Sequence, residues 1–452
     1  MLFAALSLVA CTGSGNYPTP PDWGDQPTDT FPQFYGRVPK NLLMISMDTF
    51  RKDHLDRYGD THAAPFLSTL ADHGVVMDDH LQCSNWTFAS TSCTLAGRHN
   101  EQAGMIPKLS DTLATPWPQG TPFLASYLHD AGFYSILAST NGWLAPEWNN
   151  TDGYDMPYLP GTGLAWPLWE SARGRLTDAI ADGRASDRWL LHLHFVEPHA
   201  AYDPPEEYLA GLEDLPPVPW DLANRDVHYE EAKNDWGSLS PEIQELLSEH
   251  LHVRYAGDIS HMDDEFQMIF GDMQARGLLD DTLIVFWTDH GKQFWEHGNQ
   301  THAYSLFREE TEGLLWFWAP NIIPGSWDGP TSSIDLVPTS LQLYGLPLDE
   351  RLTGTPIGEA PEDRPRFMNT IARLGPASGV VQNHMKMTFS WFGTVRMFDL
   401  QADPAELNDL YDPTNPSAEA QALWSELEPM VELAQPLALE NPVNWPDELL
   451  AR

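Results

Sequence analysis

Two short apolar runs that end in potential metal ligands constrain the fold of this chain more than any other feature. Residues 41–47 lead directly into Asp48, and residues 282–287 lead through Thr288 into Asp289 and His290. Runs of this length are typical of strands buried on both faces of a parallel sheet. In open sheets of this kind, ligands bind beyond the carboxyl ends of the strands. The two runs therefore predict a buried sheet with a candidate site at its edge.

Further strand-like and helical segments alternate along the chain. Residues 133–139 and 189–196 resemble the first two runs, and helical patterns occupy residues 64–74 and 242–278. Strands that alternate with helices predict an α/β fold, with a central, mainly parallel sheet and helices on both faces. We expect residues 39–362 to form one catalytic domain.

The pattern changes near the C-terminus. Short β-like runs lie between residues 380 and 398, and a long acidic helical stretch follows at residues 417–433. This composition predicts a small α+β subdomain over residues 363–452.

The first residues predict an exported protein. Residues 1–10 form an apolar run too short to span a bilayer, and it ends in Leu8-Val9-Ala10-Cys11, which resembles the lipobox of bacterial lipoproteins. No Lys or Arg precedes the run, and the alternative is a disordered apolar terminus. We expect residues 1–16 to be a signal or lipobox-like leader with a lipid anchor at Cys11, and the proline-rich residues 17–38 to be a flexible tether. The protein would then be a cell-envelope lipoprotein, or periplasmic or extracellular.

The charge of the chain argues against a nucleic-acid partner, and its cysteine content leaves one possible disulfide pair. The chain has 24 Lys and Arg against 65 Asp and Glu, a formal net charge of −41, and no basic cluster of the kind that holds nucleic acid. Besides Cys11, only Cys83 and Cys93 are present. An exported protein could oxidise this pair, but the spacing alone does not show whether it does.

The residue types at the strand ends suit a metal ion. Carboxylates with an imidazole suit Zn²⁺ or Mn²⁺, and a mostly oxygen shell suits Ca²⁺ or Mg²⁺. Any one of these residues could instead be a cap or turn residue. Residues 86–98 add several hydroxyls before Gly97-Arg98. One hydroxyl could begin a helix whose N-terminus favours an anion, or it could be an ordinary helix cap.

Several segments, taken in order, resemble the sulfatase family of the alkaline-phosphatase-like superfamily. They are residues 41–51 with 53–55 and 58–59, residues 64–75, residues 195–199 with Tyr202 and 204–205, residues 288–291 with 296–298, residues 333–339, and residues 397–404. The resemblance extends from about residue 40 to residue 412. It implies a metal-dependent hydrolase of sulfate or phosphate-type esters, with a small-molecule or glycan anionic ester as substrate.

The chain departs from the family at the nucleophile. Sulfatases carry a Cys or Ser in a Cys/Ser-x-Pro-x-Arg setting that is oxidised to formylglycine. Counting back from Gly97-Arg98, Thr87 stands at this position, Ala89 at the proline and Thr91 at the arginine. Thr cannot be converted by the same route, but phosphodiesterase-like members of the superfamily use an unmodified Thr. The resemblance therefore implies Thr87 as a metal-activated nucleophile. Thr favours a phosphate or phosphonate ester, whereas the overall motif pattern favours a sulfatase.

The resemblance also implies the ligands of the metal. Asp48, Thr87, Asp289 and His290 would share one divalent ion, which is Ca²⁺, Zn²⁺ or Mn²⁺. A second ion would need a further set of ligands, for which Glu197 and His199 are the nearest candidates in an incomplete set.

The remaining candidates concern the substrate. His199 and His302 would bind the charged group or protonate the leaving oxygen, each with a packing role as the alternative. The family's Gly-Lys-x-His segment is missing, and Asn141 stands near its place as a neutral donor. Lys292 could contact substrate charge, although a solvated lysine is the simpler interpretation.

Two other functions are consistent with these departures. A binding protein on a decayed sulfatase fold would explain the missing proline, arginine and lysine, but it would not need metal donors at both strand ends. A phosphoryl-group transferase to an envelope acceptor usually has membrane helices, and no other apolar stretch here is long enough to be one. For a hydrolase, the net charge of −41 repels anionic substrates, so we expect faster substrate capture at higher ionic strength.

Overall fold

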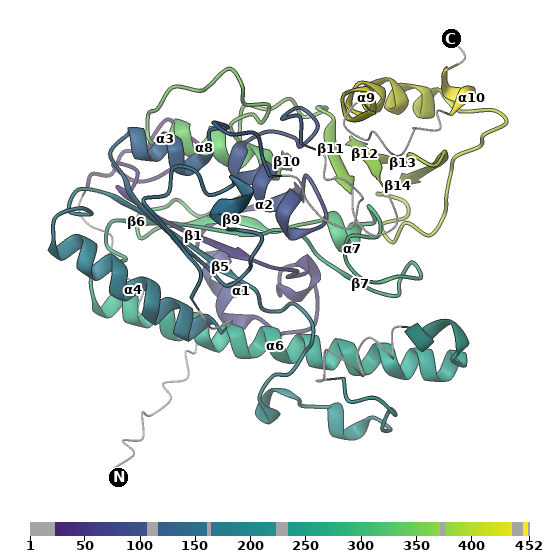
Figure 1. The fold of residues 1–452 in the computed structure, drawn as a ribbon, viewed down its shortest axis with the longest axis horizontal. Coiled ribbons are helices and arrows are strands. Elements are labelled where there is room, and N and C mark those ends of the chain that lie inside the picture. Colours follow the sequence, from purple (N-terminus) through teal and green to yellow (C-terminus); the bar gives the residue numbers. More distant parts are fainter. Residues whose placement is uncertain are drawn as a thin grey trace.

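A mixed eight-stranded sheet forms the centre of the molecule (Figure 1). The computed structural model describes residues 23–105, 116–160, 164–222, 234–370, 376–435 and 446–450, so the expected leader at residues 1–16 lies outside them. The strand order is β10-β2-β9-β6-β1-β5-β3-β4. Its strands are β1 (Asn41–Met47), β2 (Val75–Leu81), β3 (Tyr134–Ser139), β4 (Met156–Tyr158), β5 (Trp189–Phe195), β6 (Thr282–Thr288), β9 (Leu315–Trp318) and β10 (Gly325–Ser332). β9 is antiparallel to both of its neighbours and every other pair is parallel, which confirms the predicted α/β class.

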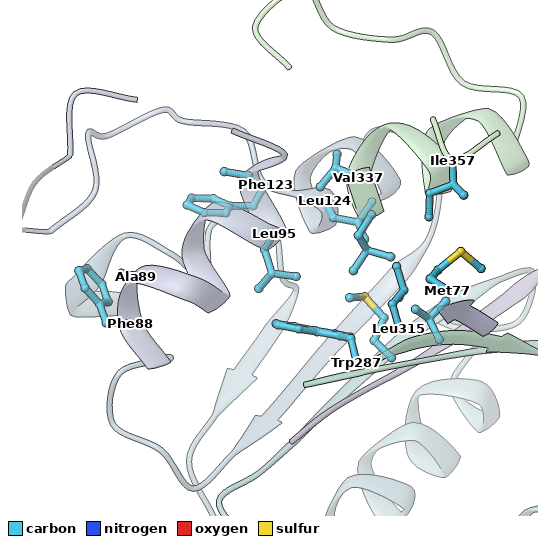
Figure 2. Close-up of a cluster of buried hydrophobic side chains, with 14 of the residues drawn as sticks. Met77, Phe88, Ala89, Leu95, Phe123, Leu124, Trp287, Leu315, Val337 and Ile357 are labelled. Atoms are coloured by element: carbon cyan, nitrogen blue, oxygen red, sulfur yellow. The ribbon is translucent and has the colours of Figure 1, made fainter. Parts of the chain in front are cut away.

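Helices cover both faces of this sheet because each strand alternates its side chains between two apolar cores. One core packs under α2 (Thr87–Ala96), α3 (Leu124–Asp130) and α8 (Leu336–Leu343), and Figure 2 shows part of it around Trp287. The other core packs against α1 (Pro65–Asp72), α4 (Ala165–Ala181) and the long α6 (Pro241–Ala275). We call these the α2 face and the α6 face.

The C-terminal part adds a second sheet beside the first. Strands β11 (Arg366–Thr370), β12 (Ala377–Gln382), β13 (Met385–Ser390) and β14 (Thr394–Asp399) form an antiparallel sheet, and α9 (Ala418–Ala434) packs on it. Buried side chains of this sheet and of α9, such as Phe389 and Trp424, belong to the same apolar core as Phe88 of α2. The expected boundary at residue 363 therefore separates two kinds of sheet, although one core continues across it.

The remaining elements are short connections. They are β7 (Gln293–Phe294), β8 (Gln300–Thr301), α7 (Arg308–Thr311), α10 (Asp447–Leu450), and the 3-10 helices η1 (Lys52–His54), η2 (Pro146–Trp148), η3 (Glu206–Tyr208), η4 (Leu212–Asp214), η6 (Trp236–Ser238) and η7 (Ser333–Asp335). No helix among the described residues is long and apolar enough to cross a membrane.

The second half of the segment expected as a tether packs on the domain. Phe34 is completely buried and forms a bridge with Ile322, and the Tyr35 amide donates to the Asn321 carbonyl over 2.9 Å. The expectation of a flexible chain up to residue 38 does not hold for these residues. Burial of an aromatic side chain stabilises the packed form by more than the conformational entropy that the segment loses on ordering.

A disulfide joins Cys83, which lies just beyond β2, to Cys93 in α2. The pairing that the sequence left open is therefore present in the structure. It ties the helix that begins at Thr87 to the C-terminal end of β2.

Candidate active site

Three buried side chains meet where β1 and β6 end. The two strands are parallel neighbours in which Met47 pairs with Thr288, so Asp48 and Asp289 follow at the same level. The Nε2 atom of His290 lies 3.7 Å from Asp48 Oδ1 and 3.6 Å from Asp289 Oδ2. One ligand atom from each of the three residues lies within 4.8 Å of the others, and all three residues are buried. We call Asp48, Asp289 and His290 the metal trio.

The electrostatics of this trio fit a divalent cation. Burial and the neighbouring Asp48 raise the pKa of Asp289 well above its usual range, while burial lowers the pKa of His290 to about 3. Two carboxylates without water repel one another, and a neutral imidazole offers a lone pair instead of a charge. A divalent ion would supply the missing positive charge, and this donor set suits Zn²⁺, Mn²⁺ or Ca²⁺.

Thr87 brings a hydroxyl to the trio. It is the first residue of α2, and its Oγ1 lies 3.3 Å from Asp48 Oδ2 and 3.4 Å from His290 Nε2. The neighbouring hydroxyls hold the helix in place, because Thr91 donates to the Thr87 carbonyl over 2.6 Å and Ser90 donates to the Asp289 carbonyl. The hydroxyl-rich segment thus begins a helix whose free N–H groups favour an anion.

Asn141 and Lys292 have different surroundings in the structure. Asn141 Nδ2 donates to Asp48 Oδ2 over 3.0 Å, so this amide contacts the metal trio directly. Lys292 is completely buried, and the alternative of a solvated lysine is wrong. Its ammonium donates to the Pro198 carbonyl over 3.1 Å and to the Tyr202 hydroxyl over 2.7 Å, and burial lowers its pKa to about 7. Lys292 therefore holds the loop that leads to His199.

His199 and His302 converge on the trio from two loops. The ring centroid of His302 lies 4.4 Å from that of His290 and 5.3 Å from that of His199. His302 stands between Thr301 and Ala303, which both have positive φ angles of 76° and 68°. Few residues other than glycine adopt this conformation without strain, so the surrounding contacts hold this loop in place. We call His199 and His302 the histidine pair.

Glu197 turns away from this cluster. It lies on the α6 face, where the Ala165 amide donates to it and Glu265 of α6 is close, and burial raises its pKa to about 8. The structure thus separates Glu197 from the metal trio, and the second-metal set that it would complete is not formed among the described residues.

A buried carboxylate that the sequence did not single out connects the parts of the site. Glu310 is completely buried and accepts hydrogen bonds from Asn85, Gln293, Ser305 and the Tyr304 amide. Asn85 precedes Thr87, Gln293 follows the metal trio, and Ser305 follows His302. Two adjacent glutamates in a short helix carry no signal of such a role, since exposed pairs of this kind are common.

Comparison with known proteins identifies the family. A sequence model of the family described as Sulfatase matches residues 40–346. The chain belongs to the sulfatase family. It is 23% identical over 429 residues to the choline-sulfatase of Rhizobium meliloti, an alignment that covers 82% of each chain. Membership in this family makes the chain an ester hydrolase.

Solved structures share the fold of this sulfatase-family chain. BT4656, solved with its substrate D-glucosamine-2-N,6-O-disulfate, superimposes with a TM-score of 0.66 at 16% identity, over 91% of this chain and 100% of the other. The phosphonate monoester hydrolase of Silicibacter pomeroyi superimposes with a TM-score of 0.62 at 19% identity, over 90% and 96%. At this level of identity the likeness concerns the fold.

Proposed function

We propose that the chain hydrolyses sulfate- or phosphate-type esters with Thr87 Oγ1 as the covalent nucleophile. The observation that carries this proposal is the position of the hydroxyl, within 3.4 Å of atoms of both Asp48 and His290 and at the start of α2. The metal trio and Thr87 would hold one divalent ion, which lowers the pKa of a bound alcohol and neutralises its alkoxide.

Two displacements complete the reaction. In the first, Thr87 Oγ1 bonds to the phosphorus or sulfur while the bond to the ester oxygen breaks, and His199 or His302 gives a proton to the departing alcohol. Before this step the Thr87 hydroxyl releases its proton to solvent. In the second displacement, water gives a proton to the same histidine as its oxygen bonds to the phosphorus or sulfur, the bond to Thr87 breaks, and the Thr87 oxygen takes a proton from solvent. The amide groups at the start of α2 stabilise the negative charge on the transferred group.

Within this class we favour a phosphate or phosphonate ester over a sulfate ester. Thr87, Ala89 and Thr91 replace the residues that a formylglycine sulfatase needs, whereas an unmodified threonine suffices for phosphoryl transfer. The fold shared with a phosphonate monoester hydrolase accords with this preference. The sulfated glucosamine named for BT4656 supports an anionic sugar ester as the second class to test.

The test is a substrate panel with matched variants. Protein purified without chelator is assayed for bound metal and for turnover of aryl sulfate, phosphate monoester, phosphodiester and phosphonate monoester substrates. We expect Thr87→Ala to bind metal and to lose at least ~10³-fold in turnover, and Thr87→Ser, which keeps a hydroxyl, to retain much more. Turnover that survives in Thr87→Ala would remove this residue from the mechanism. Metal-free wild-type protein that turns over none of these esters would favour the binding-protein alternative.

We also propose that the protein is exported and anchored through Cys11. The disulfide between Cys83 and Cys93 supports this location, because such bonds persist in oxidising compartments. Labelling of expressing cells with a radioactive fatty acid should mark the wild-type protein and leave Cys11→Ser unmarked. Equal labelling of both would exclude the anchor at Cys11.

A further inference from the structure

Two buried histidines on β5 are not used by the mechanism above. His192 and His194 lie on the α2 face of a strand whose other residues are apolar, and both are completely buried. Ser46 Oγ lies 2.8 Å from His192 Nε2 and 2.8 Å from His194 Nδ1. The Tyr154 hydroxyl lies 2.8 Å from His192 Nδ1. Tyr154, His192, Ser46 and His194 therefore form one continuous chain of hydrogen bonds, which we call the Tyr154 chain.

The hydrogen bonds of the Tyr154 chain can run in either of two donor-to-acceptor directions, and Tyr154 determines which one. Among the described residues, the hydroxyl of Tyr154 has no acceptor other than His192 Nδ1, so it donates there. His192 then carries its proton on Nε2 and donates to Ser46, and Ser46 donates to His194 Nδ1. Burial lowers the pKa of both histidines to about 3, so each remains neutral with a single ring proton. The chain consequently places the proton of His194 on Nε2.

That last N–H group has no partner within the described part of the protein. His194 Nε2 is buried and makes no hydrogen bond there. A buried donor without an acceptor costs free energy, so such a group in a folded protein calls for an explanation.

The position of His194 explains why this N–H group has no partner among the described residues. The residue pairs with Ser46 on one side and with Ser139 on the other, so it lies just below Asp48 and Asn141 at the same edge of the sheet. His194 is also close enough to His290 for the two imidazoles to influence one another electrostatically. The unpartnered N–H group thus lies beside the metal trio.

We propose that His194 Nε2–H is a neutral hydrogen-bond donor for an oxygen of the transferred sulfate- or phosphate-type group. This inference rests on the proposed function, since it assigns an additional contact in the same site. The proton on Nε2 distinguishes this role from that of a metal ligand, because a metal binds the bare nitrogen of an imidazole. Tyr154 is then a positioning residue that sets which nitrogen of His194 carries the proton.

The first experiment measures inhibition by inorganic sulfate and phosphate during turnover of whichever ester the protein accepts. We expect His194→Phe to raise both inhibition constants about 10- to 100-fold, as for loss of a hydrogen bond to a charged group. His194→Gln keeps an N–H donor and should recover part of this loss. His80→Phe is the matched control, because His80 is an equally buried histidine on β2 that bonds Thr331 away from the site. Unchanged inhibition constants in His194→Phe would overturn the inference and leave the proposed function intact.

The second experiment observes the ring protons of the wild-type protein directly. Nitrogen NMR of histidine-labelled wild-type protein reports which ring nitrogen carries a proton, with the His194 signal identified by its loss in His194→Gln. We expect a proton on Nε2 whose signal shifts when sulfate replaces chloride at constant ionic strength. Tyr154→Phe should give a mixture of the two ring forms and inhibition constants raised about two- to fivefold. A proton on Nδ1 in the wild type, or no response to sulfate, would overturn the inference.

Discussion

The metal trio and the histidine pair lie side by side, but the protein positions them in different ways. The metal trio follows two adjacent parallel strands, so the register between β1 and β6 determines where its side chains lie. The histidine pair comes from loops with positive φ angles around His302 and with buried polar side chains beneath them. The comparison shows that strand register suffices to place the metal trio, whereas the histidine pair depends on buried polar side chains beneath its loops.

That support comes from two buried titratable residues. Lys292 holds the loop of His199 through the Pro198 carbonyl and the Tyr202 hydroxyl, and Glu310 holds the loop of His302 through Ser305 and the Tyr304 amide. Lys292 is remote in sequence from the His199 loop. Glu310 is close in sequence to the His302 loop, but it is remote from Asn85, which it connects to that loop. Buried polar groups of this kind specify a conformation only when their partners are all in place.

The largest effect is expected from the metal trio. Asp289→Asn should abolish metal binding at micromolar metal and reduce turnover by roughly 10³-fold or more, because a ligand and a negative charge are lost together. Metal content by elemental analysis and turnover by initial rates check this. Asp263→Asn changes an equally buried aspartate on the α6 face and should keep the metal. Full metal content in Asp289→Asn would contradict the assigned site.

The histidine pair should show a smaller effect that depends on the substrate. His302→Ala and His199→Ala should each slow hydrolysis of esters with a poor leaving group by about 10²- to 10⁴-fold if that histidine is the general acid. With 4-nitrophenyl esters the loss should be much smaller, since nitrophenolate leaves without a proton. A plot of rate against leaving-group pKa for each variant identifies the acid. An equal loss on all esters would assign both histidines to binding the anion.

Glu310, which lies beneath the histidine pair, should affect how the unfolding free energy depends on pH. Burial raises the pKa of Glu310 from 4.5 to about 7, so between these values the folded protein holds a proton that the unfolded chain has released. The unfolding free energy should therefore fall as the pH rises through this window, by about 3 kcal/mol from this group. Glu310→Gln cannot titrate and should lack that part of the slope.

Denaturant titrations of both proteins at several pH values check this prediction. Glu170→Gln, which changes an exposed carboxylate on α4, should keep the wild-type slope. Parallel curves for the wild type and Glu310→Gln would show that the buried carboxylate does not titrate in this range.

The smallest effect concerns the whole surface. With a net charge of −41, the protein repels an anionic ester before the local positive groups act, and salt screens this repulsion. We expect kcat/KM for an anionic ester to rise severalfold between low and physiological ionic strength, with little change for kcat. A kcat/KM that falls as salt rises would indicate attraction at the site entrance instead.

Much of the fold was predictable from the chain because apolar runs and their spacing carry it. The strands at residues 41–47 and 282–288 and the helix at residues 241–275 correspond closely to the expected segments. The boundary of the packed N-terminal segment was not predictable, since Phe34 contacts residues nearly three hundred positions away. Aromatic residues scattered among prolines give no sign of such a partner.

By itself, the sequence determined the fold class and the metal trio, because local periodicity and strand ends are properties of neighbouring residues. Only the tertiary structure decided the roles that depend on distant partners. It buried Lys292 beneath the His199 loop, turned Glu197 to the α6 face, and joined Tyr154 to His194 through Ser46. The physical reason is that hydrogen-bond direction and desolvation depend on which groups are in contact in the folded protein. Neighbouring residues in the sequence do not determine contacts between distant ones.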